Sequence, residues 1–365
     1  MLAAAALMFA ACAQFDTVNE VPESEPQAIG FDTYAQMTTR ATENNDGTYH
    51  DELIVHHDDF AVWAYKNTST VPVFGTDATT GTTVDADDYS YGDLKYWDKT
   101  ATNYYFYAAA PATATDPKWT LNGVTDIATQ KDGYFTISDV ILQASNFRTT
   151  TPNETPTTTF KGAGVDKDLM IAAPYNDNEQ FEEVQLKFIH ILSRLNIIVK
   201  KATGLTPDPT ITLNSVKVYG INLKGSFDES KAAATTAGSI ARWTPAATPV
   251  TTNQYAYISN LALTTDDQYI IESLVIPQNV DFEAIETDGT TVETKPYLEV
   301  IYTINGEQYK AYYNLAATFG KTAGQSLPFN EGWQNTLTIT ISPASITFAG
   351  NVSTWSETED DQQID

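Results

Sequence analysis

The sequence predicts an all-β protein made of two tandem antiparallel β-sandwiches. Strand-forming residues are abundant, with 20 tyrosines and 16 phenylalanines, and aromatic residues favour strands. In several segments apolar residues recur at every second position, which is the period of a strand with one buried face. A chain of 365 residues also has the length of about two domains of roughly 150 residues each.

The segment 184–200, VQLKFIHILSRLNIIVK, links the two expected domains. Alternate positions are occupied by Leu186, Phe188, His190 and Leu192, and then by Leu195, Ile197 and Val199. An apolar run of this length also fits a buried helix, but the many β-branched residues favour strands. We expect this segment to be the last connection of a domain 29–183 and the first strand of a domain 184–365.

The first domain is expected to contain strands at 29–35, 60–66, 104–110, 134–137 and 169–172. Pro111 ends the third of these, because proline lacks the N–H that a strand ladder needs. The threonine-rich segments 77–88 and 149–159 are expected to be loops.

The second domain alternates more regularly. Residues 298–304 and 309–315 alternate on either side of Asn305-Gly306, a pair that favours a type I′ hairpin turn because both positions need positive φ. Further strands are expected at 336–341 and 346–348, followed by an acidic tail at 357–365. No repeat of solenoid or propeller period is found.

The chain is strongly acidic, with 47 Asp and Glu against 20 Lys and Arg and a formal charge of −27. Nucleic acid would be repelled by such a surface and is excluded as a partner. The acidity also discourages unplanned association of exposed strand edges.

The single cysteine, Cys12, follows a short apolar stretch that ends in small residues. Residues 1–12 therefore look like a signal peptide with a lipoprotein box, in which Cys12 is the acylated residue. The alternative is an ordinary cleaved leader with an incidental cysteine. The stretch is too short to span a bilayer, and the polar, proline-containing residues 13–28 are expected to be a tether.

Catalytic and metal-binding patterns are weak. His56-His57-Asp58-Asp59 cannot converge on a metal in a straight strand, because successive side chains point to opposite faces. His190 lies on an apolar face and is expected to be a hydrogen-bonded core residue. No nucleophile elbow, phosphate loop, zinc-protease or dinucleotide motif is present. We expect that the chain is not an enzyme and that it binds no metal and no cofactor.

Taken in order, the motifs resemble those of the fimbrillin family, the subunits of type V pili. The matching pieces are the cysteine-ended leader, Ile29–Tyr34 with Thr39-Arg40-Ala41, Phe60–Tyr65, Trp97 with Tyr104–Pro111, Leu169-Met170, Leu186-x-Phe188-x-His190, Leu274-Val275-Ile276-Pro277-Gln278, and Trp333 with Ile346-x-Phe348, Val352 and Trp355. The match covers nearly the whole chain, and the ordered set is more specific than any single motif.

The resemblance implies two transthyretin-like sandwiches and export as an outer-membrane lipoprotein that becomes part of a cell-surface fimbrium. It implies that an arginine-specific protease cuts between Arg40 and Ala41 and that the first strand, within 29–41, is then removed. Removed side chains would include Ile29, Phe31 and Tyr34. A strand of a neighbouring pilus subunit would fill the groove, and the candidate donor carries Ile346, Phe348, Val352 and Trp355.

A second reading remains open. The chain could be a surface lipoprotein that binds glycan or a host protein and never polymerises. The segment around Arg40 distinguishes the two readings, because a simple binding protein has no need of a cleavage site there. The sequence does not separate a stalk subunit from a tip or anchor subunit.

Overall fold

The computed structural model describes residues 26–35, 59–85, 88–112, 118–142, 168–177, 182–231, 240–246, 255–282 and 296–354. Within these ranges nearly all regular structure is β-strand, with one short α-helix, α1 (Leu315–Thr318), and one 3-10 turn, η1 (Gln130–Asp132). The predicted all-β class with several antiparallel sheets is confirmed. The segment 184–200 forms strands, as predicted, and not a helix.

Six strands form the first sheet, in the order β1-β8-β7-β4-β2-β3. They are β1 (Phe31–Ala35), β2 (Phe60–Lys66), β3 (Thr82–Val84), β4 (Tyr104–Ala110), β7 (Met170–Asp177) and β8 (Val184–His190). Neighbouring strands are antiparallel except at one edge, where β1 runs parallel to β8. Almost every residue of β2 and β4 is buried, so both faces of this sheet are covered.

A second sheet, in the order β12-β11-β6-β5, packs on one face of the first. Its strands are β5 (Thr120–Asn122), β6 (Tyr134–Ile141), β11 (Lys224–Asp228) and β12 (Trp243–Pro245). The core between the two sheets combines aromatic residues from both halves of the chain, among them Trp63, Phe135, Phe227 and Trp243. The chain thus returns to the first sandwich after leaving it.

The sheets divide the chain differently from the expected boundary at 183/184. Strand β8 belongs to the first sheet and β9 (Ser193–Lys201) to the C-terminal sandwich, so the chain crosses between His190 and Ser193. Strands β11 and β12 come from the expected second domain but pair with β6. Alternation identifies a strand by its buried face, but it carries no information about which sheet that face covers.

The C-terminal sandwich consists of sheets β13-β10-β16-β17 and β14-β9-β19-β20. The remaining strands are β10 (Ile211–Val218), β13 (Tyr255–Ala262), β14 (Gln268–Val275), β16 (Tyr297–Ile304), β17 (Glu307–Asn314), β19 (Trp333–Ile341) and β20 (Ile346–Thr354), with the small pair β15 (Gln278–Asp281) and β18 (Ser326–Phe329) beside them. The predicted hairpin is present: Asn305 and Gly306 have φ of 49° and 90° between β16 and β17. The aliphatic core between the sheets includes Leu195, Ile197, Val300 and Leu337.

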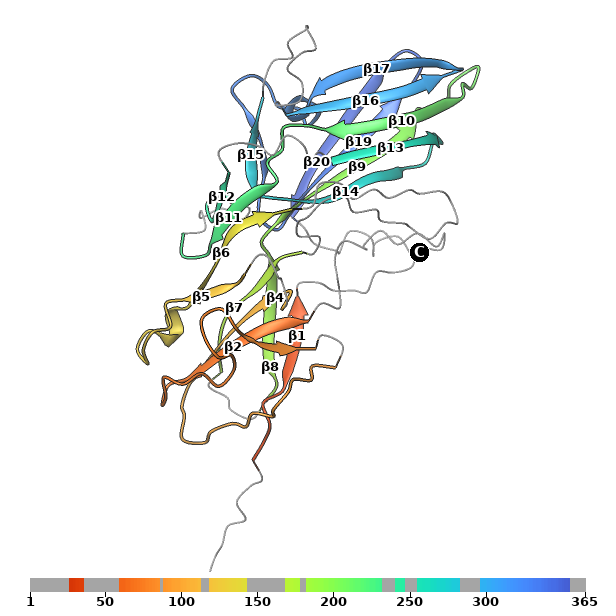
Figure 1. Ribbon diagram of the computed structural model, residues 1–365. Helices are drawn as coiled ribbons and strands as arrows, with labels where there is room; N and C mark the ends of the chain where they lie inside the picture. Colours follow the sequence, from red (N-terminus) through yellow and green to blue (C-terminus); the bar gives the residue numbers. More distant parts are fainter. Residues whose placement is uncertain are drawn as a thin grey trace, which may run out of the picture.

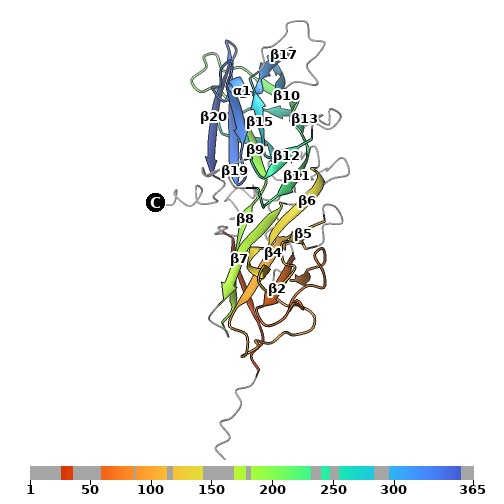
Figure 2. The ribbon, with the colours of Figure 1, turned by 90° about the vertical axis from the view of Figure 1, so that its left-hand side faces the viewer.

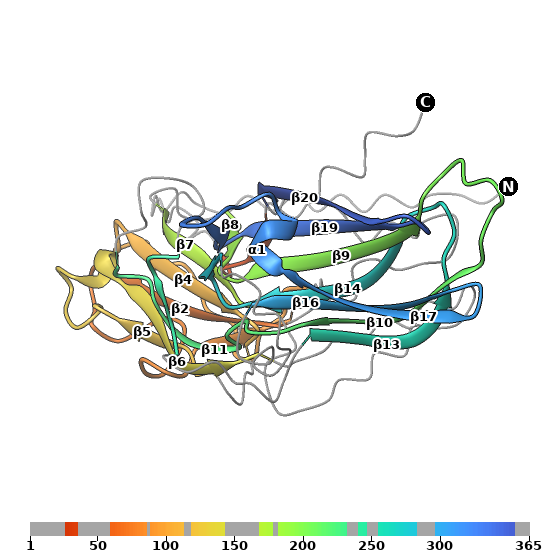
Figure 3. The same ribbon diagram turned by 90° about the horizontal axis from the view of Figure 1, so that it is seen from above.

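Figures 1 and 2 show an elongated molecule with the first sheet at one end and the C-terminal sandwich at the other. Strands β6 and β11 lie between the two ends, so the second sheet bridges them. Seen from above, β9, β19 and β20 form one layer of the C-terminal sandwich and β10, β16 and β17 the other (Figure 3).

Candidate assembly site at the first strand

Strand β1 lies at the edge of the first sheet and pairs with β8 alone. The parallel register runs from Phe31 opposite Val184 to Ala35 opposite Phe188, with Tyr34 opposite Lys187. A strand at an edge has backbone partners on one side only. It can therefore be exchanged for another strand that restores the same hydrogen bonds.

The side chain of Phe31 is only 3% exposed, although it belongs to an edge strand. Its ring makes edge-to-face contacts with Phe60, Phe74, Tyr91 and Phe106, at centroid distances of 6.4, 5.2, 5.8 and 6.1 Å. These distances lie in the range of favourable aromatic pairs. Phe31 thus fills an aromatic pocket that four other elements or loops of the first domain build.

Ile29 is 1% exposed and lies in the same core as Phe31. This core also contains one face of β8, formed by Val184, Leu186 and Phe188. Burial of a large apolar side chain stabilises a fold by about 1.5–3 kcal/mol. The burial of Ile29 and Phe31 therefore contributes several kcal/mol to holding the first strand in the domain, on the order of 3–6 kcal/mol for the two side chains.

The backbone just before β1 is clamped by hydrogen bonds. Ile29 N donates to Lys95 O (2.8 Å), Trp97 N to Gln27 O (3.0 Å), Val184 N to Gly30 O (2.8 Å) and Tyr91 Oη to Ile29 O (2.5 Å). If the segment left, these groups would lose their partners, and an unpaired buried donor or acceptor costs about 1–3 kcal/mol. A new strand that pairs with these backbone groups would therefore be more stable in the emptied groove than water would be.

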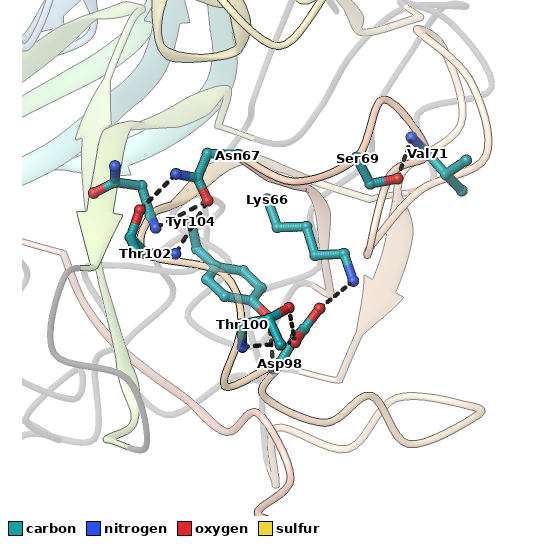
Figure 4. A network of polar contacts seen from close by, with 9 residues as sticks. Lys66, Asn67, Ser69, Val71, Asp98, Thr100, Thr102 and Tyr104 are labelled. Atoms are coloured by element: carbon teal, nitrogen blue, oxygen red, sulfur yellow. Dashed lines mark hydrogen bonds and ion pairs between the residues drawn. The ribbon is translucent and has the colours of Figure 1, made fainter.

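A polar network next to the groove braces the loop that carries Trp97 (Figure 4). Lys66 Nζ donates to Asp98 Oδ2 at 2.7 Å, and Asp98 N donates to Tyr104 Oη at 2.7 Å. The hydrogen bonds from Lys66 and Thr100 lower the pKa of Asp98 to about 2. None of these contacts includes a residue of β1, so we expect these hydrogen bonds to remain when β1 is removed.

Sequence analysis did not identify Phe74 and Tyr91 as residues of this site. Both lie in connections between strands, where no period marks the buried positions. Their aromatic character was the only available signal, and it is common in this chain. Lys95 was also missed, because its contribution is a backbone carbonyl and does not depend on residue type.

The candidate donor strand β20 occupies the edge of its own sheet. It pairs antiparallel with β19 over its full length, from Ile346 opposite Ile341 to Thr354 opposite Trp333. Ile346, Phe348 and Val352 are half-buried and pack on the C-terminal core. In the single chain, therefore, β20 completes its own sandwich.

Close packing at Gly350 fixes the position of β20. A Cβ added there would lie 2.5 Å from Cδ1 and 2.7 Å from Cα of Phe319. The latter atom is backbone, so no rotation of the Phe319 side chain can relieve this contact. Phe348 adds a ring contact to Tyr313 at 4.5 Å.

Several predicted site residues lie outside the described part of the chain. These are Cys12, Arg40, Ala41 and Trp355, and the His56-His57-Asp58 portion of the weak metal motif. Of the remaining residues, Ile29 and Phe31 come together in one core, and Ile346, Phe348 and Val352 line one face of β20. The two groups lie in different sandwiches.

His190 is half-buried, and its Nδ1 is hydrogen-bonded to Oδ2 of the buried Asp168. Among the described residues, no group of three or more His, Cys, Asp or Glu is placed to hold a metal ion. The same ranges contain no helix that is both long and apolar enough to cross a membrane.

A largely buried ion pair joins the second sheet to the C-terminal sandwich. Arg242, next to β12, donates from Nε (2.9 Å) and Nη2 (2.5 Å) to Oε2 of Glu331, which precedes β19. Burial raises the pKa of Glu331 to about 7, although Arg242 acts in the opposite direction. Neighbouring Glu229 is half-buried, and its partial burial raises its pKa. The carboxylates are thus held in an environment that disfavours their charge.

The fold and this site together define an all-β protein of packed sandwiches whose first strand is a deeply anchored edge strand. The model of the fimbrillin-like family matches residues 39–355. The chain belongs to the fimbrillin-like family, a family of fimbrial and cell-adhesion subunits, and the predicted resemblance is confirmed.

Individual relatives are more distant. Fimbrium subunit Fim1C of Phocaeicola vulgatus is 25% identical over 392 aligned residues, which cover 99% of this chain and 97% of the relative. A putative cell adhesion protein from Bacteroides uniformis has a solved structure that is 19% identical, with a TM-score of 0.45, over 90% of this chain and 99% of that one. The solved structure of a fimbrial protein from Bacteroides vulgatus is 17% identical, with a TM-score of 0.45, over 90% of this chain and 99% of that one.

Proposed function

We propose that this chain is a structural pilus subunit that polymerises by strand exchange after its N-terminal strand is cut free, and that it serves adhesion at the cell surface. In this proposal the chain is not an enzyme and needs no cofactor. Its partners are further pilus subunits and an arginine-specific protease. Lipid on Cys12 holds the precursor in the outer membrane.

The observation that carries the proposal is the combination of edge position and deep burial in the first strand. Phe31 fills a pocket of four aromatic rings, yet its strand pairs with β8 alone. The residues Thr39-Arg40-Ala41 follow this strand in the sequence. A cut there would separate the strand from the domain it completes, and the strand would lose the advantage of being covalently attached.

The strand β20 supports the proposal as the donor. It carries apolar residues on one face, and it is itself an edge strand. Leaving its own sheet breaks pairing with β19 alone. In a polymer, the β20 of one subunit would pair with β8 of the next.

The test is the state of assembly after cleavage. After brief treatment with an arginine-specific protease, the wild-type chain should have Ala41 as its first residue. It should then form oligomers that appear as a ladder of bands on a gel run in mild detergent, whereas Arg40→Ala should stay uncut and monomeric. Arg40→Lys is the matched control, because it should assemble after trypsin but not after the arginine-specific protease. Deleting residues 345–365 should abolish ladders and leave the cut intact.

Cleaved wild-type protein that stays monomeric at high concentration would overturn strand exchange. A surface lipoprotein that binds glycan or a host protein would then be the better account. Ladders formed by uncut Arg40→Ala would contradict the role of the cut while leaving polymerisation in place.

A further inference from the structure

The first strand and the candidate donor share one short pattern. The first is Ile29-Gly30-Phe31 and the second is Ile346-Thr347-Phe348, so each has isoleucine and phenylalanine two residues apart. In a strand, residues two apart face the same side. Ile29 and Phe31 indeed share one core, and Ile346 and Phe348 pack on another.

We propose that β20 of a second copy of this chain enters the emptied groove parallel to β8, with Ile346 in the place of Ile29 and Phe348 in the place of Phe31. This inference rests on the strand exchange proposed above and fixes its direction and register.

The two side chains, isoleucine and phenylalanine, differ in shape, and this difference selects the direction. The Phe31 site is lined by the rings of Phe60, Phe74, Tyr91 and Phe106, all in edge-to-face contact. In the parallel register a phenylalanine again fills this site. An antiparallel strand centred on the same residue would exchange the two side chains and put Ile346 among the four rings, which leaves part of the pocket empty and places a ring in the isoleucine site.

The backbone is compatible with the parallel register. Thr347 would take the place of Gly30, whose carbonyl accepts from Val184 N at 2.8 Å. A Cβ at Gly30 would lie 3.3 Å from Cγ of Glu183, an exposed side chain that can move by the few tenths of an ångström required. A β-branched residue therefore fits at this position.

The register also places the rest of β20 along β8. Ala349 would take the position of Asp32, opposite Gln185, and Val352 that of Ala35, opposite Phe188. Phe188 is 5% exposed and belongs to the core that Phe31 fills. Val352 would extend the buried face by one apolar residue.

Disulfide trapping between separate copies tests this register. All proteins carry Cys12→Ser, so that the introduced cysteine is the sole cysteine in each chain. Gln185→Cys protein is mixed with either Ala349→Cys or Ser345→Cys protein, cut after Arg40, and oxidised. In the parallel register residue 349 lies opposite Gln185, and in the antiparallel one residue 345 does.

We expect a disulfide between positions 185 and 349 in the cut mixture and none in the uncut mixture. Polymer that is trapped instead through positions 185 and 345 would overturn the parallel register and leave strand exchange standing. Absence of polymer in the cysteine-free protein would reject strand exchange itself, so the two failures are distinguishable.

An exchange of the two side chains provides a second measurement. The double variant Ile346→Phe with Phe348→Ile keeps the composition of β20 but puts each side chain in the wrong pocket. We expect assembly to slow by roughly tenfold or more, because one site is overfilled and the other underfilled. Assembly as fast as wild type, or faster, would contradict the parallel register.

Discussion

Replacing Phe31 by alanine tests how firmly the first strand is anchored. The side chain is 3% exposed and contacts four aromatic rings. Truncation of a buried phenylalanine costs about 3–5 kcal/mol, the sum of lost transfer free energy and the cavity left behind. We expect the free energy of unfolding of the first sandwich to fall by about this amount, with the lower end favoured because an edge strand can relax into the cavity.

Urea unfolding of the uncut protein measures the effect. Trp63 and Trp97 lie in the two cores that flank the first sheet, so tryptophan fluorescence reports on this sandwich. The midpoint should move to lower urea while the slope m stays unchanged. Leu94→Ala is the matched control: Leu94 is 58% exposed, and its truncation should change stability by no more than about 0.5 kcal/mol.

A loss below about 1 kcal/mol for Phe31→Ala would refute the reasoning, because a surface substitution can already change stability by about 0.5 kcal/mol. The first strand would then be a loosely attached segment, and its removal would leave little driving force for a replacement. In the cut protein the same variant should release its first strand faster than wild type, which separation of the fragment by chromatography would show.

Three further predictions concern other parts of the chain. Gly350→Ala should loosen β20, because its Cβ would clash with the Phe319 backbone. Amide exchange in β20 should rise and assembly of cut protein should accelerate, whereas unchanged exchange would refute the tight packing. For Glu331, whose folded pKa of about 7 exceeds the unfolded value of 4.5, the protonated form stabilises the fold, so this contribution is lost as pH rises from about 4.5 to about 7. Over this pH window, the free energy of unfolding of the wild type should fall by up to about 3 kcal/mol relative to that of Glu331→Gln. If the difference in unfolding free energy between the two proteins did not change with pH, the burial of this carboxyl would be contradicted. Cys12→Ser should abolish incorporation of labelled fatty acid, and equal label on both proteins would exclude Cys12 as the lipid site.

Local features of the fold could be predicted from the sequence because each depends on neighbouring residues. Strand β2 covers the aromatic-rich segment 60–66 that was predicted to be a strand, and β4 ends before Pro111. The turn at Asn305-Gly306 needed only the positive φ that these two residues tolerate. The order of strands within each sheet, in contrast, depends on contacts between distant segments.

The interlocking of the two halves is the clearest case of such long-range order. Phe227 ends a run of alternating apolar residues that begins at Ile221, and Trp243 lies outside any such run. Neither pattern marks them as partners of Phe135, yet they complete its core. In the same way, the pocket of Phe31 is built by Phe74 and Tyr91 from irregular connections. A single sequence shows that such residues are apolar, but it does not show which pocket they close.

In the proposed mechanism, the energy balance of assembly follows from the fact that both edge strands are already docked in the single chain. Moving β20 out of its own sheet breaks its ladder with β19 and uncovers the half-buried Phe348. Entering the groove rebuilds a ladder with β8 and buries the same ring among four others. The interactions that β20 loses in its own sheet and those that it gains in the groove are of the same kind. Whether the exchange takes place therefore depends on β1. While β1 is covalently attached, it competes with any second copy at an effective concentration in the millimolar range, and the exchange is suppressed. A cut between β1 and β2 removes this advantage, and the groove then takes whichever strand fills the Phe31 pocket best.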